Sequence, residues 1–223
     1  MTDARGEILG RVRATKADPG GSAVAIPRRY RRAGTLDDGA RFELLCSRIG
    51  DYQAKVVPVR RAGIAAAIED ECAQRDARRL VIPTGLPSEW RPKGLELIPD
   101  DGLSAAELDA LDGVITGCTV AIAETGTIAL SAGDHEGRRA ISLVVDLHIC
   151  VVEPHQIVEI VPEAISALAE AARRRSPITL ISGPSATSDI ELNRIEGVHG
   201  PRQLVVIVVR GQTAGHDLGP VVP

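Results

Sequence analysis

Aromatic residues are scarce in this chain of 223 residues, where they make up only 2% of the composition. They are Tyr30, Phe42, Tyr52 and Trp90, and all four lie in the first 90 residues. Proteins that bind single-stranded nucleic acid stack the bases on aromatic side chains, and a site that sandwiches a cofactor ring needs the same platforms. The shortage therefore argues against both kinds of site.

An excess of positive charge is also missing, because 26 Lys and Arg residues stand against 30 Asp and Glu residues and give a net charge of -4. Nucleic-acid binding relies on clustered positive charge, so we expect no nucleic-acid partner. No apolar run approaches the roughly 20 residues of a membrane-spanning helix. The polar N-terminus shows no apolar signal-peptide segment. These features predict a cytoplasmic protein without a membrane segment.

Closely spaced cysteines are absent as well, since no C-x-x-C pair occurs among Cys46, Cys72, Cys118 and Cys150. Zinc ribbons, thioredoxin-type sites and iron–sulfur clusters use such pairs. We therefore expect reduced, mostly buried thiols and no cofactor or metal. A row of metal-like ligands at 148–155 is discounted, because strand alternation would place His148 and Cys150 on one face and Glu153 and His155 on the other.

Apolar strands and helices alternate from residue 54 onward. Strands are predicted at 55–59, 79–83, 95–98, 178–182 and 203–209, and helices at 61–75, 104–111 and 162–175. This alternation predicts an α/β fold of three layers, with a mostly parallel sheet covered on both faces. Residues 113–152 hold several apolar segments without helices between them, so we expect part of the sheet to be antiparallel.

The front of the chain has a different pattern. Helical periodicity at 3–14 and 36–50 flanks a loop that contains a basic stretch at 27–32, which is either solvated or a clamp for an anionic partner. We interpret residues 1–50 as an N-terminal helical extension and 51–210 as the main domain. Residues 211–223, rich in Gly and Pro, are predicted to form a flexible tail.

The first segment whose side chains could bind a ligand or take part in catalysis is AETGT at residues 123–127, between two apolar runs. Glu124 can act as an acid, a base or a hydrogen-bond acceptor, while Thr125 and Thr127 offer hydroxyl groups. Gly126 allows a close approach of the backbone to a ligand. The alternative is a tight turn that joins two strands.

The second segment is SGPSATSDIE at residues 182–191, which follows an apolar strand. Ligands of parallel sheets bind beyond the carboxyl ends of strands, often at the start of the next helix. Candidate ligand-binding residues here are Gly183, Ser185, Thr187, Asp189 and Glu191. The two acids favour substrate hydroxyls, a cation or an arginine of a partner over a phosphate. The alternative is a capping box of Ser188 and Glu191 at a helix start.

Two further candidates are single residues in loops. His199 lies between glycines at 197–201, where its imidazole is freely placed, although a simple turn explains the segment equally well. Arg138, in the charged loop at 133–139, could bind a carboxylate or a phosphate, although such charge clusters are commonly solvated. The nucleotide, hydrolase and zinc-protease motifs GxxxxGK[ST], GxGxxG, GxSxG and HExxH do not occur.

Taken in order, these segments resemble the LUD-domain family over about residues 50–210. The resemblance is carried by AETGT at 123–127, Gly137 and Arg138 with Ile141 to Leu143, SGPS at 182–185, Thr187, Asp189 to Glu191, and GVHGP at 197–201. It implies a NagB/RpiA/CoA transferase-like fold, as in ribose-5-phosphate isomerase, CoA transferases and 5-formyltetrahydrofolate cyclo-ligase. It also implies a part in the oxidation of L-lactate to pyruvate, together with the iron–sulfur lactate utilization proteins A and B.

Two main functional hypotheses follow. In the first, the chain is a non-redox subunit of that lactate-oxidising system, and the loops at Glu124, Thr127, Asp189 and His199 bind a small anionic ligand or the partner. In the second, it is an enzyme in its own right that acts on a sugar phosphate, a CoA ester or a folate-like acid, with Glu124 as nucleophile or base. A scaffold with a vestigial pocket is a third hypothesis.

Overall fold

A computed structural model describes residues 3–16, 26–188, 194–197 and 200–211 of the chain. The chain divides into two compact units, residues 1–31 and 32–223. The first unit contains helix α1 (Ala4–Lys16), which agrees with the helix predicted at 3–14. Its apolar side chains Ile8, Leu9 and Val12 are all exposed.

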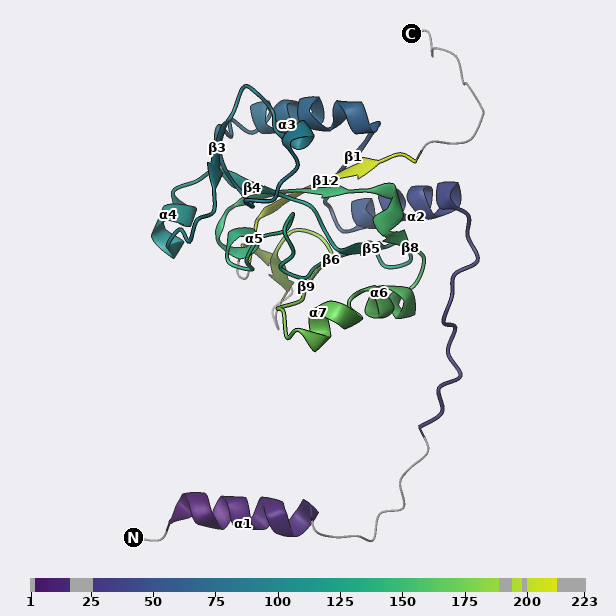
Figure 1. The fold of residues 1–223 in the computed structure, drawn as a ribbon, viewed down its shortest axis with the longest axis vertical. Helices are drawn as coiled ribbons and strands as arrows, with labels where there is room; N and C mark the ends of the chain where they lie inside the picture. The colour runs from purple at the N-terminus through teal and green to yellow at the C-terminus, as the bar shows by residue number, and fades with distance from the viewer. Residues whose placement is uncertain (1–2, 17–25, 189–193, 198–199, 212–223) are drawn as a thin grey trace. The chain divides into compact units, whose positions relative to one another are not determined.

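The second unit is built on a six-stranded parallel sheet with the order β1-β12-β7-β4-β2-β3 (Figure 1). Its strands are β1 (Lys55–Val59), β2 (Arg79–Ile82), β3 (Glu96–Pro99), β4 (Gly113–Thr116), β7 (Leu147–Val152) and β12 (Gln203–Val209). The central strands β4 and β7 are buried along their whole length, as both faces of a parallel sheet must be covered. The predicted α/β fold with a mainly parallel sheet is confirmed.

One face of this sheet is covered by α3 (Ile64–Ala73) and the short helix η2 (Ser88–Trp90). Alternate residues of the central strands point to this side, so that Ile149 of β7 and Ile207 of β12 share a core with Ile68 and Trp90. The connection η1 (Arg61–Gly63) leads from β1 directly into α3.

The opposite face packs on a second sheet and on helix α2 (Asp38–Asp51). The second sheet has the order β8-β5-β6-β9, from β5 (Val120–Ile122), β6 (Thr127–Leu130), β8 (Ile157–Val158) and β9 (Thr179–Ile181). Phe42, Leu45 and Ile49 of α2 are buried in the core between the sheets. The predicted domain boundary at residue 50 stays a prediction, but α2 packs within the second compact unit.

Short helices complete both layers. At β2 and β4, the face of the six-stranded sheet that lies opposite α3 is covered by α4 (Ala105–Asp109) and α5 (Ile141–Val144). A capping box of Ser104 and Glu107, visible in the sequence as the pattern S-x-x-E, is present at the start of α4. The outer face of the second sheet packs on α6 (Val161–Ala167), which continues into α7 (Ala169–Arg173) (Figure 1).

The single helix predicted at 162–175 is wrong in two respects. It is interrupted at Leu168, so that α6 and α7 are separate. Helical spacing within 162–175 would place Ile165 and Leu168 in one buried stripe, but Ile165 is 59% exposed. The buried positions are Ala164, Leu168 and Ala171, spaced by four and three residues; small alanines form part of the stripe, and the larger Ile165 lies outside it.

The antiparallel strands expected between 113 and 152 are present, but they belong to the second sheet. β4 and β7 are parallel neighbours in the first sheet, whereas β5 and β6 form an antiparallel hairpin in the other. The chain leaves the first sheet at the break Gly117 to Thr119. Uniformly apolar strands carry no signal for the sheet to which they belong, because they are buried on both faces in either one.

The residues that follow SGPS form a strand, and the possible helix with its cap at Ser188 falls on residues outside the described part of the chain. β10 (Ala186–Ser188) pairs antiparallel with β11 (Arg194–Glu196) as a separate two-stranded sheet. The short helix η3 (Pro154–Gln156) links β7 to β8. Among the described residues, none of the helices has both the length and the apolar character needed to cross a membrane.

Candidate functional site

The loop that contains SGPS borders a cavity of about 250 Å³. The cavity is lined by residues from three stretches of chain, at 139–148, 179–185 and 200–204. Two of the segments predicted to be functional, SGPS and the end of GVHGP, therefore meet at one place. We take this cavity as the candidate functional site.

The cavity lies at a different edge of the fold from the one expected. Leu180 of β9 pairs with Ala129 of β6 in the antiparallel second sheet, so the SGPS loop does not follow a strand of the parallel sheet. His148 is the second residue of β7 and Leu204 is the second residue of β12, so both line the cavity from the start of a parallel strand. The rule that places ligands at the carboxyl ends of parallel strands therefore does not locate this cavity.

The AETGT segment forms the hairpin turn between β5 and β6, and its hydroxyl groups reach toward the cavity. The Thr125 hydroxyl donates to Thr127 Oγ1 at 2.7 Å, and Thr127 Oγ1 lies 2.8 Å from Ser182 Oγ. Ser182 in turn lines the cavity. The turn predicted as the alternative is present, and its threonines also connect to the candidate site.

The glycines of both motifs are required by packing against the end of α2. Gly126 has φ +61, and a Cβ there would lie 2.6 Å from the carbonyl carbon of Arg48. Gly183 has φ +100, and a Cβ there would lie 2.8 Å from Tyr52 Cβ. Side chains other than glycine are strained at such angles. The close approach predicted for a ligand is, at these two positions, an approach to α2.

Glu124 is exposed on the hairpin turn and is not among the residues that line the cavity. Its backbone N–H donates to the carbonyl of Glu159 at 2.9 Å, next to the pairing of β5 with β8. The role of Glu124 as a catalytic residue therefore stays a prediction, and the structure separates it from the cavity.

Arg138 is held by an ion pair instead of facing the cavity. Its Nε and Nη2 donate to the two carboxylate oxygens of Asp100 at 2.6 and 2.8 Å, and Nη2 also donates to the carbonyl of Leu103. The Asp100 carboxylate is nearly buried, and the hydrogen bond from Arg138 lowers its pKa below the usual value. Arg138 thereby joins its own loop to the segment that follows β3; its predicted ligand contact stays a prediction.

Arg139, which the sequence reasoning missed, lines the cavity. It makes no side-chain hydrogen bond or ion pair with any other residue that the structure describes. The Ser142 hydroxyl donates to the Arg139 carbonyl at 3.2 Å and is buried beside it. The two adjacent arginines were the only feature in the sequence that pointed to a ligand-binding arginine here. A sequence does not reveal which of the two is paired within the fold.

His148 is a buried polar residue of the cavity wall. Its Nε2 lies 2.7 Å from Thr116 Oγ1 on the neighbouring strand β4. Removal of the ring from water lowers the pKa of His148 to about 4, because burial disfavours the charged form. The ring is therefore neutral at pH 7.

The remaining predicted residues are only partly covered by the structure. The Ser185 backbone N–H donates to the Pro201 carbonyl at 2.8 Å, which joins the SGPS loop to the GVHGP segment. Thr187 lies in β10 opposite Ile195. Asp189, Glu191 and His199 lie outside the described residues, so their predicted roles stay predictions.

Comparison with known proteins places this arrangement in a family. The family model described as LUD domain matches residues 104–209. Lactate utilization protein C of Deinococcus radiodurans is 52% identical over 163 residues, which cover 73% of this chain and 76% of that protein. The chain belongs to the LUD-domain family.

Two more comparisons extend the match of this LUD-domain chain. Lactate utilization protein C of Bacillus velezensis is 27% identical over 204 residues, 82% of this chain and 83% of that protein. The crystal structure of a DUF162 family protein from Deinococcus radiodurans matches with a TM-score of 0.70 and 42% identity, covering 79% of this chain and all of that one. The whole cavity lining, from 139 to 204, falls inside the LUD-domain match.

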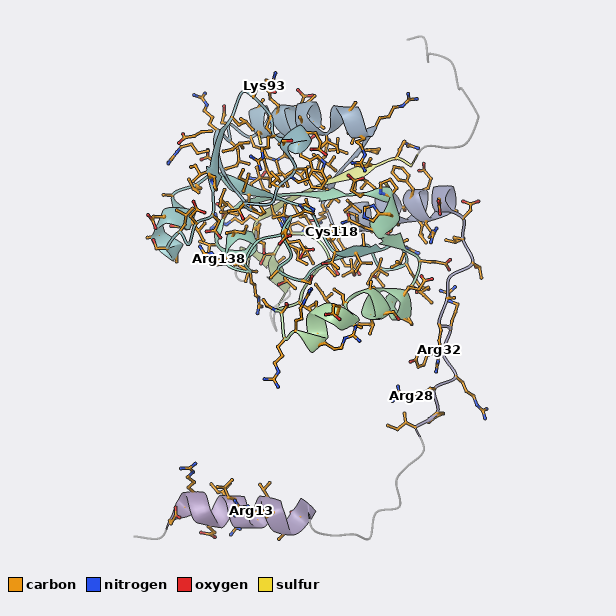
Figure 2. All side chains as sticks on the ribbon, in the orientation of Figure 1. Arg13, Arg28, Arg32, Lys93, Cys118 and Arg138 are labelled. Carbon is orange, nitrogen blue, oxygen red and sulfur yellow. The ribbon has the colours of Figure 1, made fainter. Side chains whose placement is uncertain are left out.

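Three of the four cysteines of this LUD-domain chain, Cys72, Cys118 and Cys150, are buried, and Cys46 is half-buried. Cys118 Sγ donates to Gln156 Oε1 at 3.4 Å and Cys150 Sγ donates to the Gly117 carbonyl at 3.5 Å. Both cysteines belong to the core between the sheets, and Figure 2 shows Cys118 inside the second unit. Burial raises the pKa of the Cys72 thiol to about 12. All four cysteines are free thiols. In the part of the chain that the structure describes, no three His, Cys, Asp or Glu residues are grouped to hold a metal ion.

Proposed function

We propose that this chain is a non-redox subunit of an iron–sulfur system that oxidises L-lactate to pyruvate. The observation that carries the proposal is the 52% identity to lactate utilization protein C of Deinococcus radiodurans over 163 residues. The match of similar extent to the protein of the same name from Bacillus velezensis supports it.

In this proposal, the work is divided among subunits. The oxidation removes two electrons and two protons from L-lactate, and the partner iron–sulfur proteins A and B take the electrons. Cluster ligation uses neighbouring cysteines, whereas Cys118 and Cys150 of this chain serve as buried hydrogen-bond donors to Gln156 and Gly117. The contribution of this chain is then a binding site, for which the cavity beside the SGPS loop is the candidate.

The proposal is tested in the organism that encodes the chain. Deletion of its gene is expected to abolish growth on L-lactate and to leave growth on pyruvate unchanged, because only the oxidation step is lost. A tagged copy should restore growth and retain proteins A and B when it is purified from lactate-grown cells. Unimpaired growth of the deletion strain on L-lactate contradicts the proposal.

The alternative of a stand-alone enzyme that uses Glu124 is tested with the purified chain. Glu124 is exposed on its turn, so the Glu124→Gln variant should fold normally. A ligand that binds the folded state raises its melting temperature. The subunit proposal expects no saturable rise with acyl-CoA or sugar phosphates. A rise that Glu124→Gln abolishes favours the enzyme instead.

A further inference from the structure

The cavity beside the SGPS loop presents positive charge and hydroxyl groups but no acid among its described lining residues. Its polar side chains are Arg139, Ser142, His148, Thr179, Ser182 and Ser185. Since His148 is neutral at pH 7, Arg139 is the one charged side chain in this described lining. A single uncompensated guanidinium favours a ligand with a single negative charge.

The two adjacent arginines differ in the partners that the fold gives them. Arg138 is paired with both carboxylate oxygens of Asp100. Arg139 faces the cavity and has no hydrogen-bond or ion-pair partner for its side chain among the described residues. A guanidinium presents parallel N–H donors that match the two oxygens of a carboxylate. The neighbouring residue Arg138 shows this geometry in its pairing with the two carboxylate oxygens of Asp100.

The row of hydroxyls that ends in the cavity favours an acceptor on the ligand. The Thr125 hydroxyl donates to Thr127, and the Thr127 hydroxyl can then donate its own hydrogen to Ser182. In this direction the Ser182 hydroxyl keeps its hydrogen for a ligand in the cavity. Hydrogen bonds in such a row strengthen one another, so a ligand oxygen gains from the whole row.

The size and the apolar part of the lining restrict the ligand further. The volume of about 250 Å³ is below the roughly 300–1,000 Å³ of pockets for drug-sized ligands. This size favours a ligand of a few heavy atoms over a nucleotide or a CoA ester. The walls include the aliphatic side chains of Leu143, Leu180 and Leu204. A carbon chain placed against these leucines is removed from water, which favours its binding.

We propose that this cavity binds a small aliphatic monocarboxylate. The carboxylate contacts the Arg139 guanidinium and the Ser182 hydroxyl, and the carbon chain lies against the leucines of the wall. The inference rests on the proposed function, because it names the substrate class of the same cavity. L-Lactate and pyruvate are both small aliphatic monocarboxylates. The binding itself requires no partner protein and is tested separately.

Isothermal titration of the purified full-length chain tests the inference with L-lactate, pyruvate and propionate as probes. At least one of these acids is expected to bind saturably, and the neutral amide of that acid should bind at least about tenfold more weakly because it lacks the charge. Arg139→Gln should weaken acid binding about tenfold or more, and Ser182→Ala about fivefold, for the loss of one hydrogen bond. Arg173→Gln, on the exposed end of α7, is the matched control and should change nothing.

The inference is overturned by no saturable binding of any of the three acids, by equal binding of acid and amide, or by full binding by Arg139→Gln. Tighter binding of inorganic phosphate than of the acids also overturns it. Arg139 is exposed, so its variant is expected to melt at the same temperature as the parent chain. If no acid binds but growth on L-lactate still depends on the gene, the inference is contradicted and the proposed function is not. If an acid binds but growth on L-lactate does not depend on the gene, the proposed function is contradicted and the inference is not.

Discussion

At the scale of single residues, the buried ring of His148 makes the stability of the chain depend on pH. Its pKa is about 4 in the folded chain and about 6.5 when the chain is unfolded. Between these values the unfolded state binds a proton that the folded state does not, so stability falls as the pH drops from 6.5 toward 4. We expect the free energy of unfolding in urea to be about 2 kcal/mol lower at pH 5 than at pH 7.5 from this group.

The matched variant for this prediction is His148→Gln, which keeps a polar partner for Thr116 and cannot be protonated. Its loss of stability between pH 7.5 and pH 5 should be smaller than that of the parent chain by the same amount. Parallel pH profiles for the two chains assign the acid sensitivity to other groups and contradict the assignment to His148.

The arginine doublet gives a second prediction at this scale. Arg138→Gln removes the bonds to the nearly buried Asp100 and is expected to lower the free energy of unfolding by about 1–3 kcal/mol at pH 7. The pKa of Asp100 is lowered by Arg138, so the contribution is present above the unfolded pKa and is lost as the pH falls through the folded pKa. The difference from the parent should shrink below about pH 4.

Arg139→Gln is the control for stability, because Arg139 has no side-chain partner among the described residues. It should unfold at the same urea concentration as the parent chain. Equal destabilisation by the two substitutions would show that Arg139 also has a structural role.

At the scale of elements, the hairpin turn between β5 and β6 depends on its contact with the end of α2. Gly126→Ala places a Cβ 2.6 Å from the carbonyl carbon of Arg48, at φ +61. We expect a loss of about 2 kcal/mol or more in the free energy of unfolding, from the angle and the clash together. Gly50→Ala, in α2 with open space around its Cβ position, should stabilise by up to about 1 kcal/mol. Equal effects in thermal melts contradict this account.

The elements also show what the sequence could predict and what it could not. Strand β12 and the capping box of α4 were predictable, because their signals are local: an unbroken apolar run and the pair Ser104 and Glu107. The division of strands between two sheets was not, since β4 and β5 are equally buried and equally apolar. Pairing partners are set by contacts between distant residues.

The candidate site divides in the same way. The SGPS loop was found because small and polar residues after an apolar strand are visible in the sequence, and Ser182, Gly183 and Ser185 do line the cavity. Arg139 and His148 were missed as site residues, because their place depends on what surrounds them. Only the fold shows that Asp100 pairs with Arg138 and leaves Arg139 at the cavity.

At the scale of the whole molecule, the question is where the folding unit begins. The sequence suggested residue 51, whereas the compact unit begins at residue 32 and includes α2. Phe42, Leu45 and Ile49 bury their side chains in the core that joins the two sheets. Removal of a fully buried leucine side chain alone costs about 2–5 kcal/mol, a large part of the 5–15 kcal/mol that stabilises a typical domain.

Two truncated chains turn this into a prediction. A chain of residues 32–223 is expected to unfold in a single cooperative transition, because it retains the whole second unit. A chain of residues 52–223 lacks α2 and exposes the apolar residues of β8 and β12 that α2 covers, so it should show no sharp transition and should bind a hydrophobic dye. The Leu45→Ala variant of the longer chain should fall between them and melt at a lower temperature, while Ile165→Ala, at an exposed position of α6, should change the melting temperature little. A sharp transition in the 52–223 chain would place α2 outside the folding unit and support the boundary that the sequence suggested.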